Sequence, residues 1–302
     1  AAFVGKDYVR RITRIFPPYY AVLIGTFVIY QFIGFQPEGL NSAYVRAIPF
    51  PESRAASLFY SHGILFDSMP RLFPLGWSLE VEVQFYLLAP FIFLALFRGD
   101  KRTAPWRFFV LLAVAFAVSF IALNKLVPIH SYTIASYIVY FAIGITLARY
   151  ENGVQKAFQL IGSYASLMVG FGAVAILFLI GDAECKPVAF TLVQWFLSLG
   201  SIFVLFGLAF QPTTLFGRFC RIPIVTYIGL ACYSLYLVHL QVFHVAAVIA
   251  GKFVPMSYLT LSAGFILIML AGLITGAIFF LLVEKPFASW RPLSSRKRKG
   301  PA

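Results

Sequence analysis

Two carboxylates, Glu80 and Glu82, stand close together in an otherwise apolar segment that begins at Trp77. Ionisable groups in such segments are costly to bury, and they are kept mainly where they move protons, couple ions or pair with another charge. On a helix Ser78, Glu82 and Tyr86 share one face, whereas Glu80 points about 160° away from Glu82. We therefore expect Glu82 to face the interior of a helix bundle. An interfacial carboxylate beside an aromatic-belt tryptophan is the alternative, which we favour for Glu80.

A second ionisable group, His239, lies in another apolar segment, with Ser234 and Tyr236 nearby. Histidine titrates near neutral pH and can serve as a general acid or base. Because a helix rises 1.5 Å per residue, His239 is predicted to lie about 25 Å from the cytoplasmic end of this segment, in the same outer half of the membrane as Glu82. A hydrogen-bonded packing residue is the plain alternative, because Ser and Tyr hydroxyls commonly join helices in membranes.

Three arginines, Arg10, Arg11 and Arg14, precede the first long apolar stretch. Arg10 and Arg14 share a helical face, and guanidinium groups suit a phosphorylated cofactor such as coenzyme A. A cytoplasmic anchor that follows the positive-inside rule is the alternative interpretation, and from the residues alone it is favoured.

The composition decides which elements must position these groups. Of 302 residues, 61% are hydrophobic and only 12% are charged, whereas soluble domains carry about 25% charged residues. A net charge of +13 would suggest nucleic acid in a soluble protein, but no zinc-finger spacing, phosphate loop or nucleic-acid-binding module accompanies it. We predict an all-α polytopic membrane protein with no metal site and no nucleic-acid partner.

Predominantly apolar stretches long enough to cross a bilayer core of about 30 Å number eight. They are Pro17 to Gln36, Trp77 to Phe97, Phe108 to Asn124, Ser131 to Ala148, Gly162 to Gly181, Pro187 to Phe210, Ile222 to Gly251 and Phe253 to Val283. The alternating pattern of a membrane barrel is absent, so we expect a bundle of about eight helices.

The loops between these spans differ in charge, with 18 Lys and Arg in one set and 6 in the other. By the positive-inside rule both termini of this chain are predicted to be cytoplasmic. We expect one transmembrane domain over residues 1–290 and a basic cytoplasmic tail over residues 291–302. The long outer connection, Asn41 to Gly76, includes an apolar stretch that suits either an interfacial helix or a plain connector.

Three segments together resemble the acyltransferase family 3 membrane enzymes. They are the Arg-Arg-x-x-Arg-Ile-x-Pro-x-Tyr core within Phe3 to Tyr19, the Trp-Ser-Leu-x-Val-Glu-x-Gln-Phe-Tyr run from Trp77 to Tyr86, and the Tyr-Ser-Leu-Tyr-Leu-x-His run from Tyr233 to His239. Phe141 to Gly144 and Val283 to Phe287 fit the same pattern. Glu80 and Val83 depart from it, since many relatives have a small polar residue and a second Glu there.

The resemblance implies a bacterial inner-membrane enzyme that transfers an acyl group, commonly acetyl, from cytoplasmic acyl-CoA to a hydroxyl of an extracytoplasmic glycan. It implies acyl-CoA binding near Arg10, Arg11 and Arg14. The implied catalytic residues are Glu82 and His239, and the implied supporting residues are Trp77, Ser78, Tyr86, Ser234 and Tyr236. Acetyl-CoA, or another acyl-CoA, is then a donor substrate, and no resident cofactor is expected.

Family members have about ten spans, and their first span carries an arginine and a catalytic histidine. Because this chain has eight predicted spans and starts at Ala1, we expect the first two helices to be missing from it. Expected partners are membrane lipids, the glycan acceptor and a possible separate extracytoplasmic acyl-transfer protein. The alternatives are a lipid-linked sugar transporter or flippase, which also suits one buried acid, and a non-catalytic membrane remnant.

Overall fold

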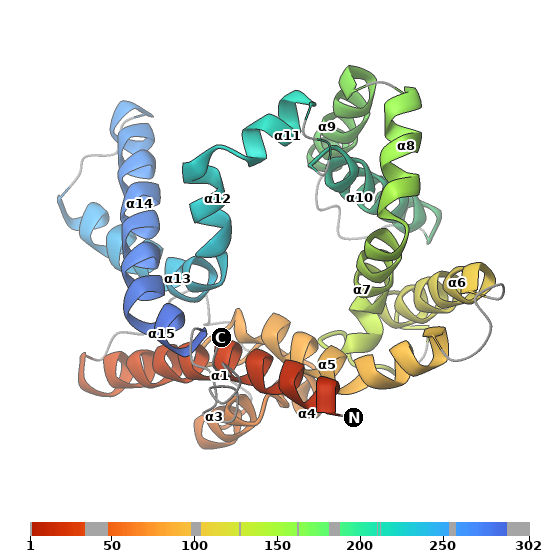
Figure 1. The fold of residues 1–302 in the computed structure, drawn as a ribbon. Coiled ribbons are helices and arrows are strands. Elements are labelled where there is room, and N and C mark those ends of the chain that lie inside the picture. The colour runs from red at the N-terminus through yellow and green to blue at the C-terminus, as the bar shows by residue number, and fades with distance from the viewer. Residues whose placement is uncertain are drawn as a thin grey trace, which may run out of the picture. The chain divides into compact units, whose positions relative to one another are not determined.

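The computed structural model describes residues 2–33, 48–97, 104–126, 128–161, 163–180, 188–209, 211, 213–253 and 258–288. Helices dominate, and no strand occurs in these ranges (Figure 1). The predicted all-α fold is therefore confirmed. The chain divides into two units, of which the first comprises Ala1–Phe59, Met69–Gly76 and Tyr227–Ala302 and the second Tyr60–Ser68 and Trp77–Thr226.

Several helices are apolar enough to cross a membrane. Among the described residues, three helices are both long enough and apolar enough to cross a membrane. They are Gly76–Phe97, Pro105–Leu123 and Gly264–Ala288. The pair Pro223–Leu230 and Cys232–Ala246 adds a fourth if it counts as one bent span. Shorter apolar helices cover Ile134–Arg149, Tyr164–Ile176 and Leu197–Ala209. A described helix occupies part of each of the eight predicted spans, while the count of full-length spans among these residues is smaller.

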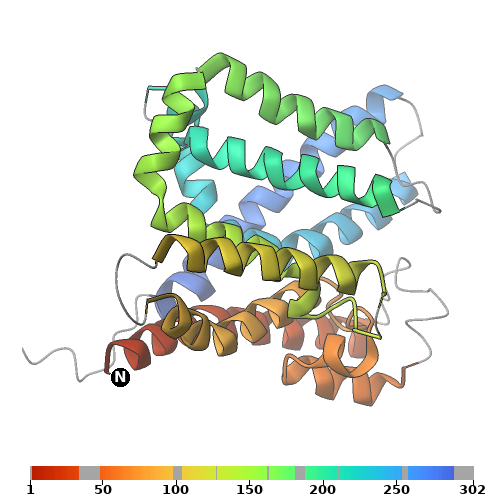
Figure 2. The same cartoon turned by 90° about the vertical axis from the view of Figure 1, so that its right-hand side faces the viewer.

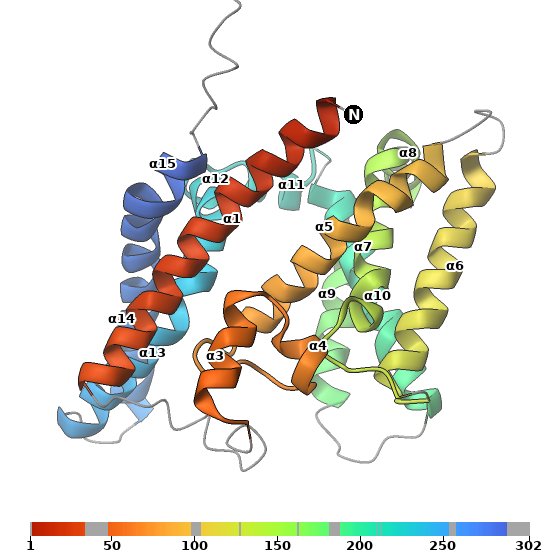
Figure 3. The same cartoon turned by 90° about the horizontal axis from the view of Figure 1, so that it is seen from below.

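The first unit is built around a long N-terminal helix. Its elements are α1 (Ala2–Val28), η1 (Ile29–Ile33), α3 (Phe50–Leu58), α13 (Cys232–Phe253), α14 (Tyr258–Phe279), η4 (Phe280–Glu284) and α15 (Lys285–Ala288). Helices α13 and α14 pack closely, and η4 and α15 lie against α1 (Figure 3). Tyr19 and Tyr20 of α1 donate hydrogen bonds to the carbonyl oxygens of Ser57 and Leu58, each at 3.0 Å. These bonds attach the end of α3 to the middle of α1.

The second unit consists of helical hairpins. Its elements are α4 (His62–Phe66), α5 (Gly76–Phe97, from its second residue), α6 (Ala104–Leu123), α7 (Ile134–Arg149), α8 (Glu151–Ile161), α9 (Ser163–Ile180), α10 (Val188–Ala209) and α11 (Leu215–Cys220). Helix α9 packs along α10 (Figure 2), and α6 packs along α7 around Ala115, Val139 and Ala142. Small side chains at such contacts let helices approach closely in a membrane.

The seventh predicted span is not one straight helix, so that prediction was wrong. Helices α12 (Pro223–Leu230) and α13 meet at an angle of 76°, with Ala231 between them. Tyr233 and Ser234 follow the break at once, and their side chains bond to other elements, which fixes the direction in which α13 starts. Apolar composition shows that a segment suits the membrane, but it does not predict such a bend. The depth inferred for His239 from a straight helix therefore does not hold.

We predict that Gly63→Ala destabilises the second unit. A Cβ atom at Gly63 would overlap the backbone carbonyl oxygen of Tyr132, which cannot rotate away, whereas the space beside Gly144 is open. Overpacking of this kind costs about 1–3 kcal/mol. Thermal unfolding of purified protein in detergent checks this, with Gly144→Ala as the matched control. Equal melting temperatures for the two variants would contradict the packing described.

Candidate functional site

Glu80 is the buried acid of the second unit. Its side chain is fully buried, and its Oε2 accepts a hydrogen bond of 2.8 Å from the backbone N–H of Gly63 in α4. Its Oε1 is also buried and has no hydrogen-bond partner among the described residues. The expectation that Glu82 rather than Glu80 faces inward was therefore wrong. The physical reason is the short helix α4, which lies over the Glu80 face of α5.

Glu82 lies half-buried one helical turn before Tyr86, whose hydroxyl donates a hydrogen bond to Glu82 Oε1. The shared face predicted from their spacing is thus confirmed for this pair. Trp77, the first residue of α5 within the second unit, packs its ring against Tyr132 at 5.6 Å and Tyr137 at 5.0 Å between centroids. Ser78 is half-buried, as Trp77 is.

Residues 62–68 are fastened to the segment before α7 by hydrogen bonds. Asp67, which has a left-handed backbone with φ of 46°, accepts bonds from the backbone N–H groups of Ser131 and Tyr132. The ring of His130 bonds to the carbonyl oxygen of Ile64. Gln84 of α5 accepts a bond of 2.8 Å from the N–H of Ile134, the first residue of α7. Helices α4, α5 and α7 are thus joined beside Glu80.

His62 is the second buried titratable group beside these bonds. Its Nδ1 lies 3.0 Å from the carbonyl oxygen of Ser68, and because a carbonyl only accepts, Nδ1 is the protonated nitrogen. Burial lowers the pKa of His62 below its ordinary value, although the bond to Ser68 opposes this. The imidazole is therefore neutral at pH 7, which suits a structural role in this segment.

His239 has the tautomer expected of a general base. Its Nδ1 lies 2.9 Å from the carbonyl oxygen of Tyr236 and 3.1 Å from that of Leu235, so Nδ1 carries the proton. The lone pair of a neutral ring is then on Nε2, for which the described part of the chain provides no hydrogen-bond partner. Tyr236 and Phe243 flank the ring at 5.9 Å and 5.6 Å between centroids. His239 belongs to the first unit and Glu82 to the second.

The two hydroxyl residues expected to support His239 have other partners. Tyr236 donates to the carbonyl oxygen of Leu75 at 2.5 Å, which ties α13 to the segment before α5. Ser234 donates to Glu284 Oε2 at 2.6 Å. That Ser234 and Tyr236 support a catalytic site stays a prediction. Their hydrogen bonds join α13 to η4 and to the segment before α5.

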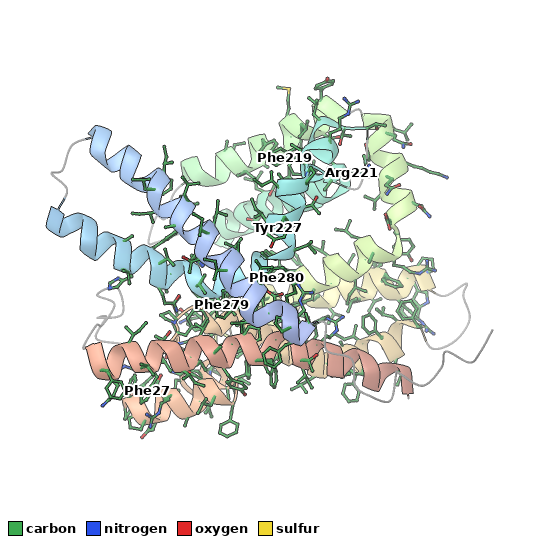
Figure 4. All side chains as sticks on the ribbon, turned by 60° about the vertical axis from the view of Figure 1, so that its left-hand side comes forward. Phe27, Phe219, Arg221, Tyr227, Phe279 and Phe280 are labelled. Carbon is green, nitrogen blue, oxygen red and sulfur yellow. The ribbon has the colours of Figure 1, made fainter. Side chains whose placement is uncertain are left out.

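Glu284 is a buried acid that the sequence did not single out. It is 1% exposed, and its Oε1 lies 3.4 Å from Nε of Arg14, forming an ion pair that joins η4 to α1. Glu284 follows a long apolar run and directly precedes Lys285, so it resembles an ordinary loop acid at a membrane boundary. The π-helical turn of η4 begins at Phe280, whose ring packs edge-on against Tyr227 at 6.0 Å (Figure 4).

The other two arginines predicted to bind the donor are Arg10 and Arg11 of α1. Arg11 is exposed, and the side chain of Arg10 lies outside the described residues. Arg14 is therefore the one member of this predicted acyl-CoA site whose ion pair the structure shows. As for metals, no group of three or more His, Cys, Asp or Glu side chains suited to a metal ion occurs among the residues searched.

The fold and these side chains define an integral membrane protein with acidic groups buried in its apolar helices. A family model described as an acyltransferase domain matches residues 4–283, and the chain belongs to that acyltransferase family. It is 26% identical over 264 residues to proteins named O-acetyltransferase OatA from Staphylococcus aureus strains NCTC 8325, COL and MRSA252. That alignment covers 76% of this chain and 39% of each relative's length. No solved structure matches the chain.

We predict that Glu80 stabilises the fold through its bond to Gly63. Glu80→Met keeps the side-chain volume but leaves the Gly63 N–H buried without an acceptor, which costs about 1–3 kcal/mol. Glu80→Gln retains a side-chain oxygen for this N–H and serves as the matched control. Unfolding of both variants in detergent measures the difference. If Glu80→Met were as stable as Glu80→Gln, the bond would not carry the role given to it.

Proposed function

We propose that the protein is an O-acyltransferase that moves an acyl group, most simply acetyl, from acyl-CoA to a hydroxyl group of a glycan. Membership of the acyltransferase family and relatives named O-acetyltransferase support this proposal. The structural observation that carries it is the tautomer of His239, whose Nε2 is left to accept a proton. Attack by a hydroxyl on a thioester needs such a base, because the oxygen must lose its proton as the new bond forms.

The proposed reaction is a direct displacement at the acyl carbon. The acceptor oxygen bonds to that carbon while the carbon–sulfur bond of the thioester breaks. His239 Nε2 takes the hydroxyl proton and returns it to the departing thiolate, so that the products are an ester and free coenzyme A. Glu82, polarised by the hydroxyl of Tyr86, accepts a hydrogen bond from the acceptor and orients it. Trp77 and Ser78 line this acceptor side in the proposal.

The donor is proposed to bind through Arg10, Arg11 and Arg14. Guanidinium groups form paired hydrogen bonds with phosphate oxygens, and coenzyme A carries several phosphate groups. The positive-inside rule favours a position in the cytoplasm, where acyl-CoA is made, for this arginine-rich part of α1 and for both termini. Transfer then proceeds from the cytoplasm to an extracytoplasmic glycan at a bacterial inner membrane. A separate extracytoplasmic acyl-transfer protein is included in the proposal as a further partner.

We predict that His239→Gln and Glu82→Gln each lower the rate of acetyl transfer without unfolding the protein. Loss of a general base typically reduces turnover by about 10²–10⁴-fold, and loss of an orienting carboxylate should have a smaller effect. The assay measures coenzyme A release and ester formation by the complete natural polypeptide in vesicles. Glu151→Gln is the control, since Glu151 lies exposed on α8 and its side chain accepts a hydrogen bond from Gln155 of the same helix.

Wild-type turnover in both variants would remove His239 and Glu82 from the mechanism. A protein that transports the glycan in response to a proton gradient, with no release of coenzyme A, would overturn the proposed function itself and favour a transporter.

A further inference from the structure

We propose that Glu284 is a positioning residue, which fixes the guanidinium of Arg14 so that its terminal nitrogens bind a phosphate group of the acyl-CoA donor. This inference deepens the donor site and rests on the function proposed above. It concerns only residues of the first unit.

Both oxygens of the buried Glu284 carboxylate have partners. Oε2 accepts a bond of 2.6 Å from Ser234, and Oε1 faces Nε of Arg14 at 3.4 Å. Arg14 is 53% exposed on its side chain, whereas Glu284 is 1% exposed. A carboxylate in apolar surroundings is costly unless it is paired and hydrogen-bonded. Here the pairing partner is a cation that reaches out toward solvent.

Hydrogen bonds from α13 hold both sides of the Arg14–Glu284 ion pair. Tyr233, the neighbour of Ser234, donates a bond of 2.7 Å to the carbonyl oxygen of Ile15, the neighbour of Arg14. Tyr233 thus holds the backbone of α1 beside Arg14, and its neighbour Ser234 holds the Glu284 carboxylate that faces the Arg14 guanidinium. Glu284 is the last residue of the π-helical turn η4. Such turns occur often at functional sites.

The ion pair with Glu284 uses Nε of the Arg14 guanidinium and leaves its two terminal nitrogens. Glu284 contacts Nε, and no hydrogen bond to Nη1 or Nη2 of Arg14 occurs within the described part of the chain. These two terminal nitrogens form a planar pair of donors that matches two phosphate oxygens. Arg11, three residues before Arg14, and Lys285, which follows Glu284, are both exposed and keep the local charge positive although Glu284 offsets Arg14. Fixing the guanidinium in advance lowers the entropic cost of binding.

The experiment compares two donors, acetyl-CoA and S-acetyl-pantetheine, which carries the same thioester without any phosphate group. For Glu284→Gln we expect KM for acetyl-CoA to rise about tenfold, as the loss of one charge-assisted contact implies, with kcat nearly unchanged. KM for S-acetyl-pantetheine should stay as in the wild type. Arg14→Gln should show the same selective rise, and the double variant should be no worse than Arg14→Gln alone, because Glu284 acts through Arg14.

Ser234→Ala is a second test that leaves the ion pair in place. It removes one bond to Glu284 and should raise KM for acetyl-CoA about two- to fivefold, again without affecting the phosphate-free donor. This variant keeps the inference testable if Glu284→Gln fails to fold. Glu151→Gln is the control for an acidic residue outside the site.

Two results would overturn the inference while leaving the proposed function intact. One is an equal rise in KM for both donors, which a general structural defect would cause. The other is an unchanged KM for acetyl-CoA in Glu284→Gln and Ser234→Ala. If the wild-type protein released no coenzyme A from any acyl-CoA, the proposed function itself would fail, and this inference with it.

Discussion

Polar groups in a membrane protein must find partners within the protein, because the hydrocarbon core offers no water. The first unit satisfies this constraint at Glu284, whose two oxygens face Ser234 and Arg14. The second unit satisfies it at one oxygen of Glu80, whose Oε2 accepts a bond from the N–H of Gly63, while Oε1 has no hydrogen-bond partner among the described residues. In both places one acid of an apolar helix fixes a segment distant in sequence. The arrangement of α1 beside η4, and of α4 over α5, depends on these contacts.

The sequence was sufficient to predict the helical segments and some local spacing. Composition and segment length indicated an all-α membrane protein, and helical periodicity placed Tyr86 beside Glu82, where the structure has it. The angle between Glu80 and Glu82 was also predictable. Which of the two is covered was not, because this depends on α4, a helix of five residues in a long connection that has no periodic signal.

Two other features depend on contacts that a single sequence does not show. The break between α12 and α13 goes together with the bonds that Tyr233 and Ser234 make to residues 218 and 50 positions away in the chain. Glu284 is at the end of an apolar run, and its burial, its ion pair with Arg14 and its bond from Ser234 distinguish it from a boundary residue. The three family-like segments include Arg14 of α1 and Ser234 of α13, but the sequence does not show that Glu284 of η4 contacts both.

The two units contribute different chemistry to the proposed reaction. The first contains the arginines proposed for the donor and a histidine, His239, whose Nδ1 faces the carbonyl oxygens of Leu235 and Tyr236. The second contains the Glu82–Tyr86 pair proposed for the acceptor hydroxyl. Because the relatives are matched over only 39% of their length, their names support acyl transfer as a class, and the acceptor has to be established for this chain by direct chemistry.

The most direct measurement is to follow the acyl group itself. The complete natural polypeptide in sealed vesicles would receive acetyl-CoA with an isotope label in the acetyl group, and a bacterial surface glycan would serve as acceptor. The account predicts labelled ester on glycan hydroxyls, formed in equal amount with free coenzyme A and removed by mild base. Label that stays in acetyl-CoA while the glycan is bound or transported would contradict the account.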